Sequence, residues 1–226
     1  MRLLKLTLSD VRFQLRYGFY LLYAIFAALY VFLLLLLPGT WRLKAGAILI
    51  YSDPAALGLF FMGAILLLEK SQRVLAALAV SPVKVGEYIL AKVFSLCLIS
   101  VAVSLLLAQV AGIPHLGLVA AGTALSSVAF SLLGIVVGAK VGSLNQYVLA
   151  TLPLEVALFL PPLLYLFWNV GQFRWYPLCG AAALLAGASR WPLLDLGYLL
   201  LLDLLLFAAA HGTVRDMWRR VGGVKL

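Results

Sequence analysis

Charged side chains are scarce in this chain of 226 residues. Lys, Arg, Asp and Glu make up 11% of it, against about 25% in a typical soluble domain. Hydrophobic residues make up 65%, and the mean hydropathy is +1.11. A soluble domain of this size could not bury so many apolar side chains. The scarcity of charge argues against secreted, nuclear and soluble-enzyme classes and predicts an integral membrane protein.

Metal-ligand, disulfide and nucleotide-binding patterns are also missing. Cys97 and Cys179 lie in separate apolar runs, and neither His115 nor His211 has a Cys or an acid at ligand spacing. The chain contains no H-E-x-x-H, no G-x-S-x-G and no G-x-x-x-x-G-K-[ST] pattern. We therefore expect a chain that is not an enzyme, holds no metal or other cofactor, and does not bind ATP through a Walker A loop.

Six apolar runs are long enough to cross a bilayer as helices, for which about 20 residues are needed. They cover residues 18–37, 50–68, 88–111, 117–138, 148–167 and 193–212. No alternating ten-residue pattern of a β-barrel competes with them. The sequence therefore predicts an all-α polytopic membrane protein that forms one transmembrane domain over residues 1–226.

The basic residues indicate the orientation of the six spans. With both termini in the cytoplasm, Arg42, Lys44, Arg174 and Arg190 are the outer ones among the 17 Lys and Arg residues. The other thirteen face inward, as the positive-inside rule favours. Trp41, Trp168, Trp175 and Trp191 fall near the outer interface. We expect a multi-pass protein of the plasma or inner membrane, and the net charge of +9 then requires no nucleic-acid partner.

Two further segments are apolar but are not predicted to span the membrane. Residues 1–17 place basic and apolar residues on neighbouring stripes of a helix, which predicts an amphipathic helix on the inner leaflet. The alternative is an ordinary basic flank without helical order. Residues 176–189 are too short to cross, and we expect a re-entrant segment in the outer leaflet between spans five and six. The alternative is an outer helix that lies flat on the protein.

The inner loop at residues 69–87 carries the most informative pattern. The second span ends at Glu69-Lys70, a short helix follows, and Ser81-Pro82 ends that helix before the third span begins. Val74, Leu75, Leu78 and Ala79 share one face of the short helix, at spacings of three and four residues. This apolar face predicts a surface for a partner or, alternatively, for lipid.

This loop resembles the equivalent segment of the type-2 ABC transporter permeases, which have a short amphipathic helix before the first of six spans. The family pattern of Glu, Leu-x-x-Leu, Ser/Thr-Pro and Leu-x-x-Lys is matched by Glu69, Leu75 with Leu78, Ser81-Pro82, and Leu90 with Lys92. Gln72-Arg73-Val74 stands where many members carry Gly-Thr, and Leu90-Ala91-Lys92 is one residue shorter than the template. Ser52-Asp53-Pro54 and Glu69-Lys70-Ser71 look most like the small fluoroquinolone-export permease branch.

The resemblance implies that residues 69–87 form a coupling loop, which would dock on a separate ABC ATP-binding subunit. Two copies of that subunit would hold ATP and Mg²⁺, and a second permease subunit, identical or different, would complete the transporter. The residues implied in coupling are Glu69, Lys70, Arg73, Leu75, Leu78, Ser81 and Pro82. The alternative is an inner loop whose apolar face lies on lipid.

Two acids fall at membrane depth, where an ionisable side chain is costly unless it meets protein, water or a ligand. Glu155 lies in the fifth span and Asp203 near the middle of the sixth. They are candidates for a route that attracts a cationic or zwitterionic substrate. The alternative is that each carboxyl group packs helices together through hydrogen bonds.

The function expected from these observations is export of an amphipathic drug-like or peptide substrate, driven by ATP hydrolysis in a partner chain. Two alternatives remain at this point. An intramembrane enzyme would need Glu155 and Asp203 as a catalytic pair, and a non-transporting membrane scaffold or channel subunit would need no ATPase.

Overall fold

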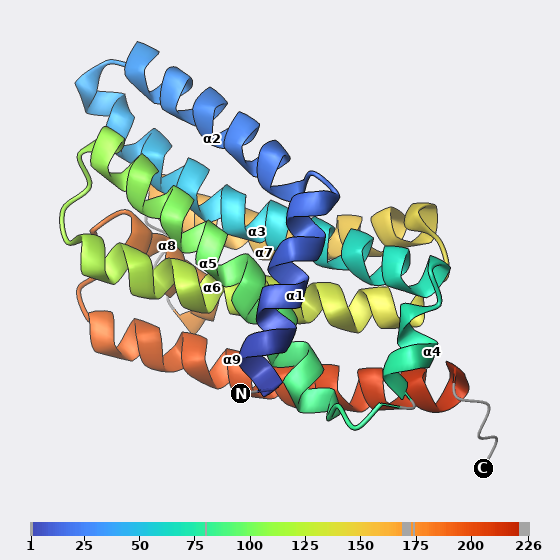
Figure 1. Ribbon diagram of the computed structural model, residues 1–226. Coiled ribbons are helices and arrows are strands. Elements are labelled where there is room, and N and C mark those ends of the chain that lie inside the picture. The colour runs from blue at the N-terminus through green and yellow to red at the C-terminus, as the bar shows by residue number, and fades with distance from the viewer. Residues whose placement is uncertain (1, 80, 169–172, 174, 222–226) are drawn as a thin grey trace.

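The computed structural model describes residues 2–79, 81–168, 173 and 175–221, with side-chain environments for all of these except 2, 40, 53–57, 79, 168 and 221. Within these residues the regular structure is helical throughout, as the sequence predicts (Figure 1). The helices are α1 (Arg2–Arg16), α2 (Phe19–Leu36), α3 (Gly39–Ser71), α4 (Val74–Ala79), α5 (Val85–Ala111), α6 (Leu116–Lys140), α7 (Leu144–Trp168), α8 (Pro177–Leu185) and α9 (Pro192–Val221).

Helix α6 occupies the centre of the bundle. It packs against α3, α5, α8 and α9. In its most apolar stretch 61% of the residues are buried, whereas the value is 17% for α2, for α7 and for α9. The peripheral helices carry rows of exposed leucines, as expected for surfaces that face lipid or a second membrane subunit.

Five helices of the described chain are long and apolar enough to cross a membrane. They are Phe19–Leu36, Val85–Ala111, Leu116–Lys140, Leu144–Phe167 and Pro192–Arg220, and each contains or closely overlaps one expected span. The remaining expected span, 50–68, lies within the 33-residue helix α3. The side chains at 53–57 lie outside the described residues, so the sixth crossing stays a prediction.

The N-terminal segment is helical, as predicted, and α1 runs across the direction of α3, α6 and α9 (Figure 1). Leu4, Leu8 and Leu15 on its apolar stripe are exposed, which suits a helix lying on a leaflet. A third face, carrying Asp10 and Gln14, packs against α5. The basic and apolar stripes in the sequence do not by themselves predict this third face.

The segment at 176–189, expected to be re-entrant in the outer leaflet, contains the short helix α8. Residues 178–185 of α8 are all buried, because α8 is packed against α3, α6, α7 and α9. A left-handed Gly187, with φ of 66°, then turns the chain toward α9. Helix α8 is therefore enclosed by other helices of the bundle. Its depth in the membrane stays a prediction.

Small residues allow α3 and α6 to approach closely. A Cβ atom on Gly134 would lie 2.8 Å from the carbonyl oxygen of Leu59 and 2.9 Å from Cβ of Met62. A Cβ on Gly63 would collide with the ring of Tyr147, whose hydroxyl donates to the Leu59 carbonyl at 2.6 Å. Gly134 and Gly138, four residues apart on α6, thus form a small-xxx-small pattern that packs within the chain.

Candidate functional site

A buried ionic cluster joins three helices below the inner loop. Lys92 of α5 donates to Glu69 of α3 at 2.5 Å and to Asp10 of α1 at 3.1 Å. The Tyr88 hydroxyl donates to the other oxygen of Glu69 at 2.7 Å. The side chains of Lys92, Glu69 and Asp10 are 1%, 6% and 17% exposed, so the charges have little access to water. Each of the three helices therefore supplies a buried charge that is compensated by a charge on another helix.

Neighbouring groups extend this cluster. Gln14 of α1 donates to the Ser95 hydroxyl at 2.6 Å, one helical turn along α5 from Lys92. The rings of Tyr88 and Trp218 meet edge to face with centroids 5.5 Å apart, which brings the end of α9 to the same place. Burial raises the pKa of Asp10 although Lys92 acts to lower it. The cluster is thus a desolvated joint between α1, α3, α5 and α9.

Lys70 caps the inner end of α6. Its Nζ donates to the carbonyl oxygens of Gly138, Ala139 and Val141 at 2.7, 3.1 and 2.7 Å. These carbonyls lack N–H partners because the helix ends there, and an ammonium group complements the negative end of the helix dipole. Burial lowers the pKa of Lys70. The residue that follows Glu69 therefore fixes α3 to α6.

The apolar face of α4 turns inward. Leu75 is 1% exposed and belongs to the hydrophobic core, and Leu78 packs against that core. Helix α4 lies against the end of α9. Leu75 is buried and anchors α4, and Glu69 is buried in the ionic cluster, so neither side chain lies on the exposed surface of the loop. The coupling role of both residues stays a prediction.

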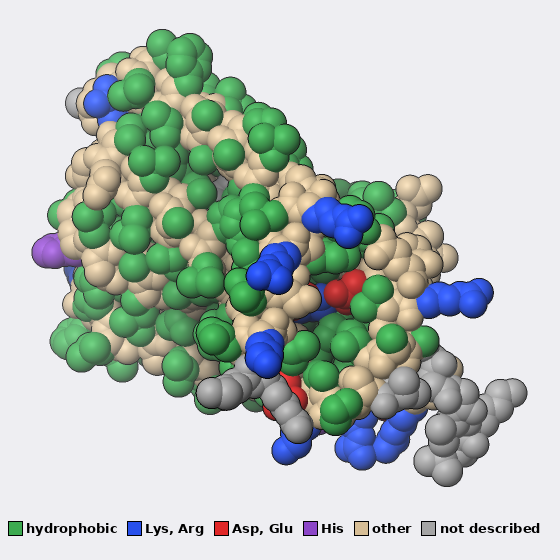
Figure 2. Space-filling view, in the orientation of Figure 1, with side chains coloured by type: hydrophobic (Ala, Val, Ile, Leu, Met, Phe, Trp, Pro, Cys, Tyr) green, Lys and Arg blue, Asp and Glu red, His purple; other side chains and the backbone are tan. Residues whose placement is uncertain are grey.

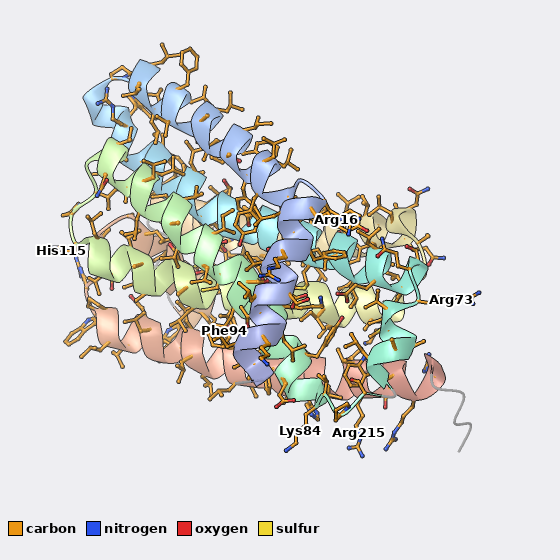
Figure 3. All side chains as sticks on the ribbon, viewed as in Figure 1. Arg16, Arg73, Lys84, Phe94, His115 and Arg215 are labelled. Carbon is orange, nitrogen blue, oxygen red and sulfur yellow. The ribbon has the colours of Figure 1, made fainter. Side chains whose placement is uncertain are left out.

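The outward face of the loop consists of other residues. Ser71, Arg73, Ala77 and Pro82 are exposed. Arg73 adopts a left-handed backbone, with φ of 57°, between α3 and α4 and projects away from the bundle (Figure 3). Ser81 accepts a hydrogen bond from the Val83 N–H and donates to the Leu78 carbonyl, which shapes the turn before Pro82. A partner would meet this polar and basic face.

Asp203 lies at mid-length of α9 and is buried. Its side chain is 7% exposed, and neither carboxyl oxygen has a hydrogen-bond partner among the described residues. The hydroxyls of Thr123 and Ser131 on α6 are also buried without described partners. Unpaired polar groups are unusual in a packed interior, which makes this carboxyl group available for a proton or a ligand.

Glu155 has a different environment. It lies half-buried on α7, beside the exposed side chains of Leu152 and Val156. Helices α7 and α9 do not pack against each other in the described part of the chain. The structure therefore does not bring Glu155 and Asp203 together as the pair that an intramembrane enzyme would need.

Basic side chains gather at one end of the molecule. In Figure 2 they cluster around α1, α4 and the end of α9, whereas hydrophobic side chains cover much of the remaining visible face. Figure 3 places Arg73, Lys84 and Arg215 at this end and His115 at the opposite one. Trp41, Trp175 and Trp191 are exposed, and the side chain of Trp168 lies outside the described residues. No group of three metal-ligating residues occurs in the described chain.

Asp10, Gln14 and Tyr88 are the site residues that sequence reasoning missed. Lys92 appeared only as a motif residue and as a basic residue on the inner side. Asp10 and Gln14 lie four residues apart and therefore on one face of a helix that otherwise carries basic residues. This spacing could have indicated a polar face that packs against another helix.

Comparison with known proteins agrees with this architecture. The model of the fluoroquinolones export permease protein family matches residues 1–220. Two relatives described as fluoroquinolones export permease proteins, from the CDC 1551 / Oshkosh and H37Rv strains of Mycobacterium tuberculosis, are each 28% identical over 200 residues. Each match covers 74% of this chain and 84% of the relative. With its apolar helices and this match over nearly its whole length, the chain belongs to the fluoroquinolones export permease protein family.

Proposed function

We propose that this permease is the membrane subunit of an ATP-driven ABC exporter and that a separate ATPase subunit docks on its inner loop. The observation that carries the proposal is the joint formed by Glu69, Lys92 and Asp10 at the base of that loop. A loop tied to α1, α3 and α5 moves these helices when it is pushed, whereas a free loop would absorb the movement.

The contacts around α4 support the same role. Leu75 packs α4 into the core, Lys70 fixes α3 to α6, and α4 lies against α9. ATP and Mg²⁺ would be held by two copies of the partner ATPase. Their closure would press on the exposed face at Arg73, Ala77 and Pro82, and hydrolysis would release it.

The test changes the exposed face and leaves the buried anchors intact. In Arg73→Glu/Ala77→Glu, we expect the ATP-binding subunit to be lost on co-purification and stimulated ATP hydrolysis to fall at least tenfold. The matched control is Arg190→Glu, an exposed basic residue near the expected outer side. Unchanged stimulated hydrolysis by a folded Arg73→Glu/Ala77→Glu protein would refute docking on this face.

A second permease subunit, identical or different, is part of the proposal. Glu155 lies on a face of α7 that is largely exposed in the single chain. A carboxylate on a spanning helix is stable there only if water or another subunit covers it. A water-lined route between two subunits supplies both conditions.

The proposed substrate is an amphipathic drug-like molecule or peptide with a cationic or zwitterionic group. The name of the two relatives points to fluoroquinolones as a first candidate. Asp203, with two unpaired oxygens, and Glu155 would attract the amine of such a molecule. Export of cationic compounds by Glu155→Gln and Asp203→Asn, at matched expression, should fall, and unchanged export of every cationic compound would reject this role.

A further inference from the structure

A groove of about 950 Å³ opens at the inner end of the bundle. Its walls come from the start of the inner loop, the last turns of α6 and the second half of α9. It lies apart from Asp203 and Glu155, which do not line it.

The mouth of this groove is basic. Lys70, Arg73, Lys140 and Arg220 line it, with Asp216 as the one acid among the lining residues. Lys70 uses its three N–H donors on the carbonyls at the end of α6, so it contributes charge without a free donor. Lys140 and Arg220 are exposed, and the described residues form no ion pair with either of them. These two side chains and Arg73 can bind an anion directly.

The floor of the groove is apolar and continues into the membrane. Ala208, Ala209 and Gly212 line it on α9, opposite Val136 and Ala139 of α6. Toward the middle of α9 the same helical face continues through Leu205 and Leu201, which are 63% and 55% exposed. An apolar track therefore leads from a spanning segment to a basic mouth.

We propose that this groove binds an anionic phospholipid of the inner leaflet. The phosphate of the headgroup would lie between Lys140, Arg220 and Arg73. One acyl chain would follow Gly212, Ala208 and Leu205 along α9. A basic pocket between spanning helices on the inner side has the chemistry that selects anionic over zwitterionic lipid.

The shape of the groove favours a lipid over other occupants. A free phosphate would use the basic mouth and leave the apolar floor exposed to water, whereas an acyl chain covers it. Because α6 and α9 both lead into the membrane, a lipid reaches the groove by sliding along α9 without leaving the leaflet. The acid Asp216 favours headgroups that also carry a hydroxyl or an amine over a bare phosphate.

The test measures lipid retention by the purified protein with native mass spectrometry. Dioleoylphosphatidylglycerol is compared with dioleoylphosphatidylcholine. The variant Lys140→Gln/Arg220→Gln should bind phosphatidylglycerol about ten- to thirtyfold more weakly, because each basic residue near an anionic lipid adds about a fivefold preference. The matched control, Lys84→Gln/Arg215→Gln, removes the same charge from exposed positions that do not line the groove.

A second variant tests the groove by shape alone. Gly212→Leu places a side chain where a Cβ meets open space, so the helix tolerates it while the floor is filled. Its control, Gly197→Leu, also meets open space on α9 but lies outside the groove. We expect Gly212→Leu to lose phosphatidylglycerol and Gly197→Leu to keep it.

Three results of the lipid-binding measurement would overturn the proposal. They are equal losses in the Lys140→Gln/Arg220→Gln and Lys84→Gln/Arg215→Gln proteins, unchanged retention in Gly212→Leu, or displacement of the lipid by millimolar inorganic phosphate. Binding of an acidic segment of the ATPase in place of the lipid would also overturn it. Because the readout needs neither ATPase nor transport substrate, its failure is distinct from failure of the proposed exporter function.

Discussion

Lys92 lies at the centre of the ionic cluster and contacts acids of two other helices. Its ammonium group faces Glu69 and Asp10 from a position with almost no access to water. A buried ion pair adds little net stability compared with an apolar pair, but the loss of one partner leaves an uncompensated charge. The cluster thus specifies which helices meet, and its stability depends on all its members.

Replacement of Lys92 by Met should therefore destabilise the protein by about 3–5 kcal/mol, because Glu69 and Asp10 lose their counter-charge. Lys84→Met, at an exposed position on the same helix end, should cost less than about 0.5 kcal/mol. Denaturant titration of the protein in detergent measures the free energy of unfolding of both variants. The double variant Glu69→Leu/Lys92→Met should recover part of the loss, and a double variant as unstable as the sum of the single changes would contradict coupling between the two residues.

The individual residues also show where sequence reasoning reached its limit. Glu69 and Lys70 were identified by resemblance to a family, and both form bonds between helices of this chain. Their role in coupling stays a prediction. Asp10 received no role: its spacing from Gln14 marks a polar face, but it does not identify Lys92, 82 positions away, as the partner. Leu75 was placed on the correct helical face, but periodicity does not tell whether that face meets a partner, lipid or the same chain.

At the level of the helices, α7 is one continuous helix although it contains three prolines, two of them adjacent. A proline leaves the carbonyl four residues earlier without an N–H donor, so Pro161 and Pro162 free the carbonyls of Ala157 and Leu158. Tyr176 donates to Ala157 at 3.2 Å and Tyr51 donates to Leu158 at 2.8 Å. Tyrosines of two other segments thus replace the donors that the prolines lack.

Tyr51→Phe should destabilise the protein by about 1–2 kcal/mol, since it leaves the Leu158 carbonyl buried without a donor. In the Pro162→Ala background the helix supplies its own N–H, and the same change should cost less. A double-mutant cycle on unfolding free energy measures the difference. Equal costs in the two backgrounds would show that the tyrosine does not compensate for the proline.

The sequence shows these prolines but does not reveal which groups satisfy the carbonyls that they free. Each freed carbonyl needs a donor within reach, and the donors lie about 107 and 19 positions from their acceptors. Hydrogen bonds between residues far apart in the sequence determine how the helices pack against one another. The presence of each helix, in contrast, follows from its local apolar sequence. For the same reason α8 could be recognised as apolar and too short to cross, but not as a helix enclosed by four others.

On the scale of the whole molecule, the sorting of charge predicts its orientation. The end that carries Arg73, Lys84 and Arg215 should face the cytoplasm, and the opposite end, at His115, should face outward (Figure 3). Hydropathy identified the five helices that are long and apolar enough to cross a membrane. It does so because the cost of placing polar side chains and unpaired backbone groups in lipid decides which segments can cross.

Cysteine labelling in intact cells tests this orientation. With a membrane-impermeant maleimide, Arg190→Cys should react from outside, whereas Lys84→Cys should react only after the cells are permeabilised. Cys97 and Cys179 are half-buried and buried, so the protein without substitutions supplies the background. The reverse pattern would invert the topology and remove the inner loop from reach of a cytoplasmic ATPase.

The ionic cluster ties α1, α3 and α5 into one unit. Helices α1, α3 and α5 share one desolvated set of charges, so relative displacement among them would break ion pairs in a medium that offers no water as replacement. Among the described residues, α2 and α7 take part in no ion pair, and 17% of the residues in their most apolar stretches are buried. We expect α1, α3 and α5 to move as one rigid body during the transport cycle, with α1 sliding along the surface of the inner leaflet. The route for substrate would then open where α2 and α7 face the second subunit.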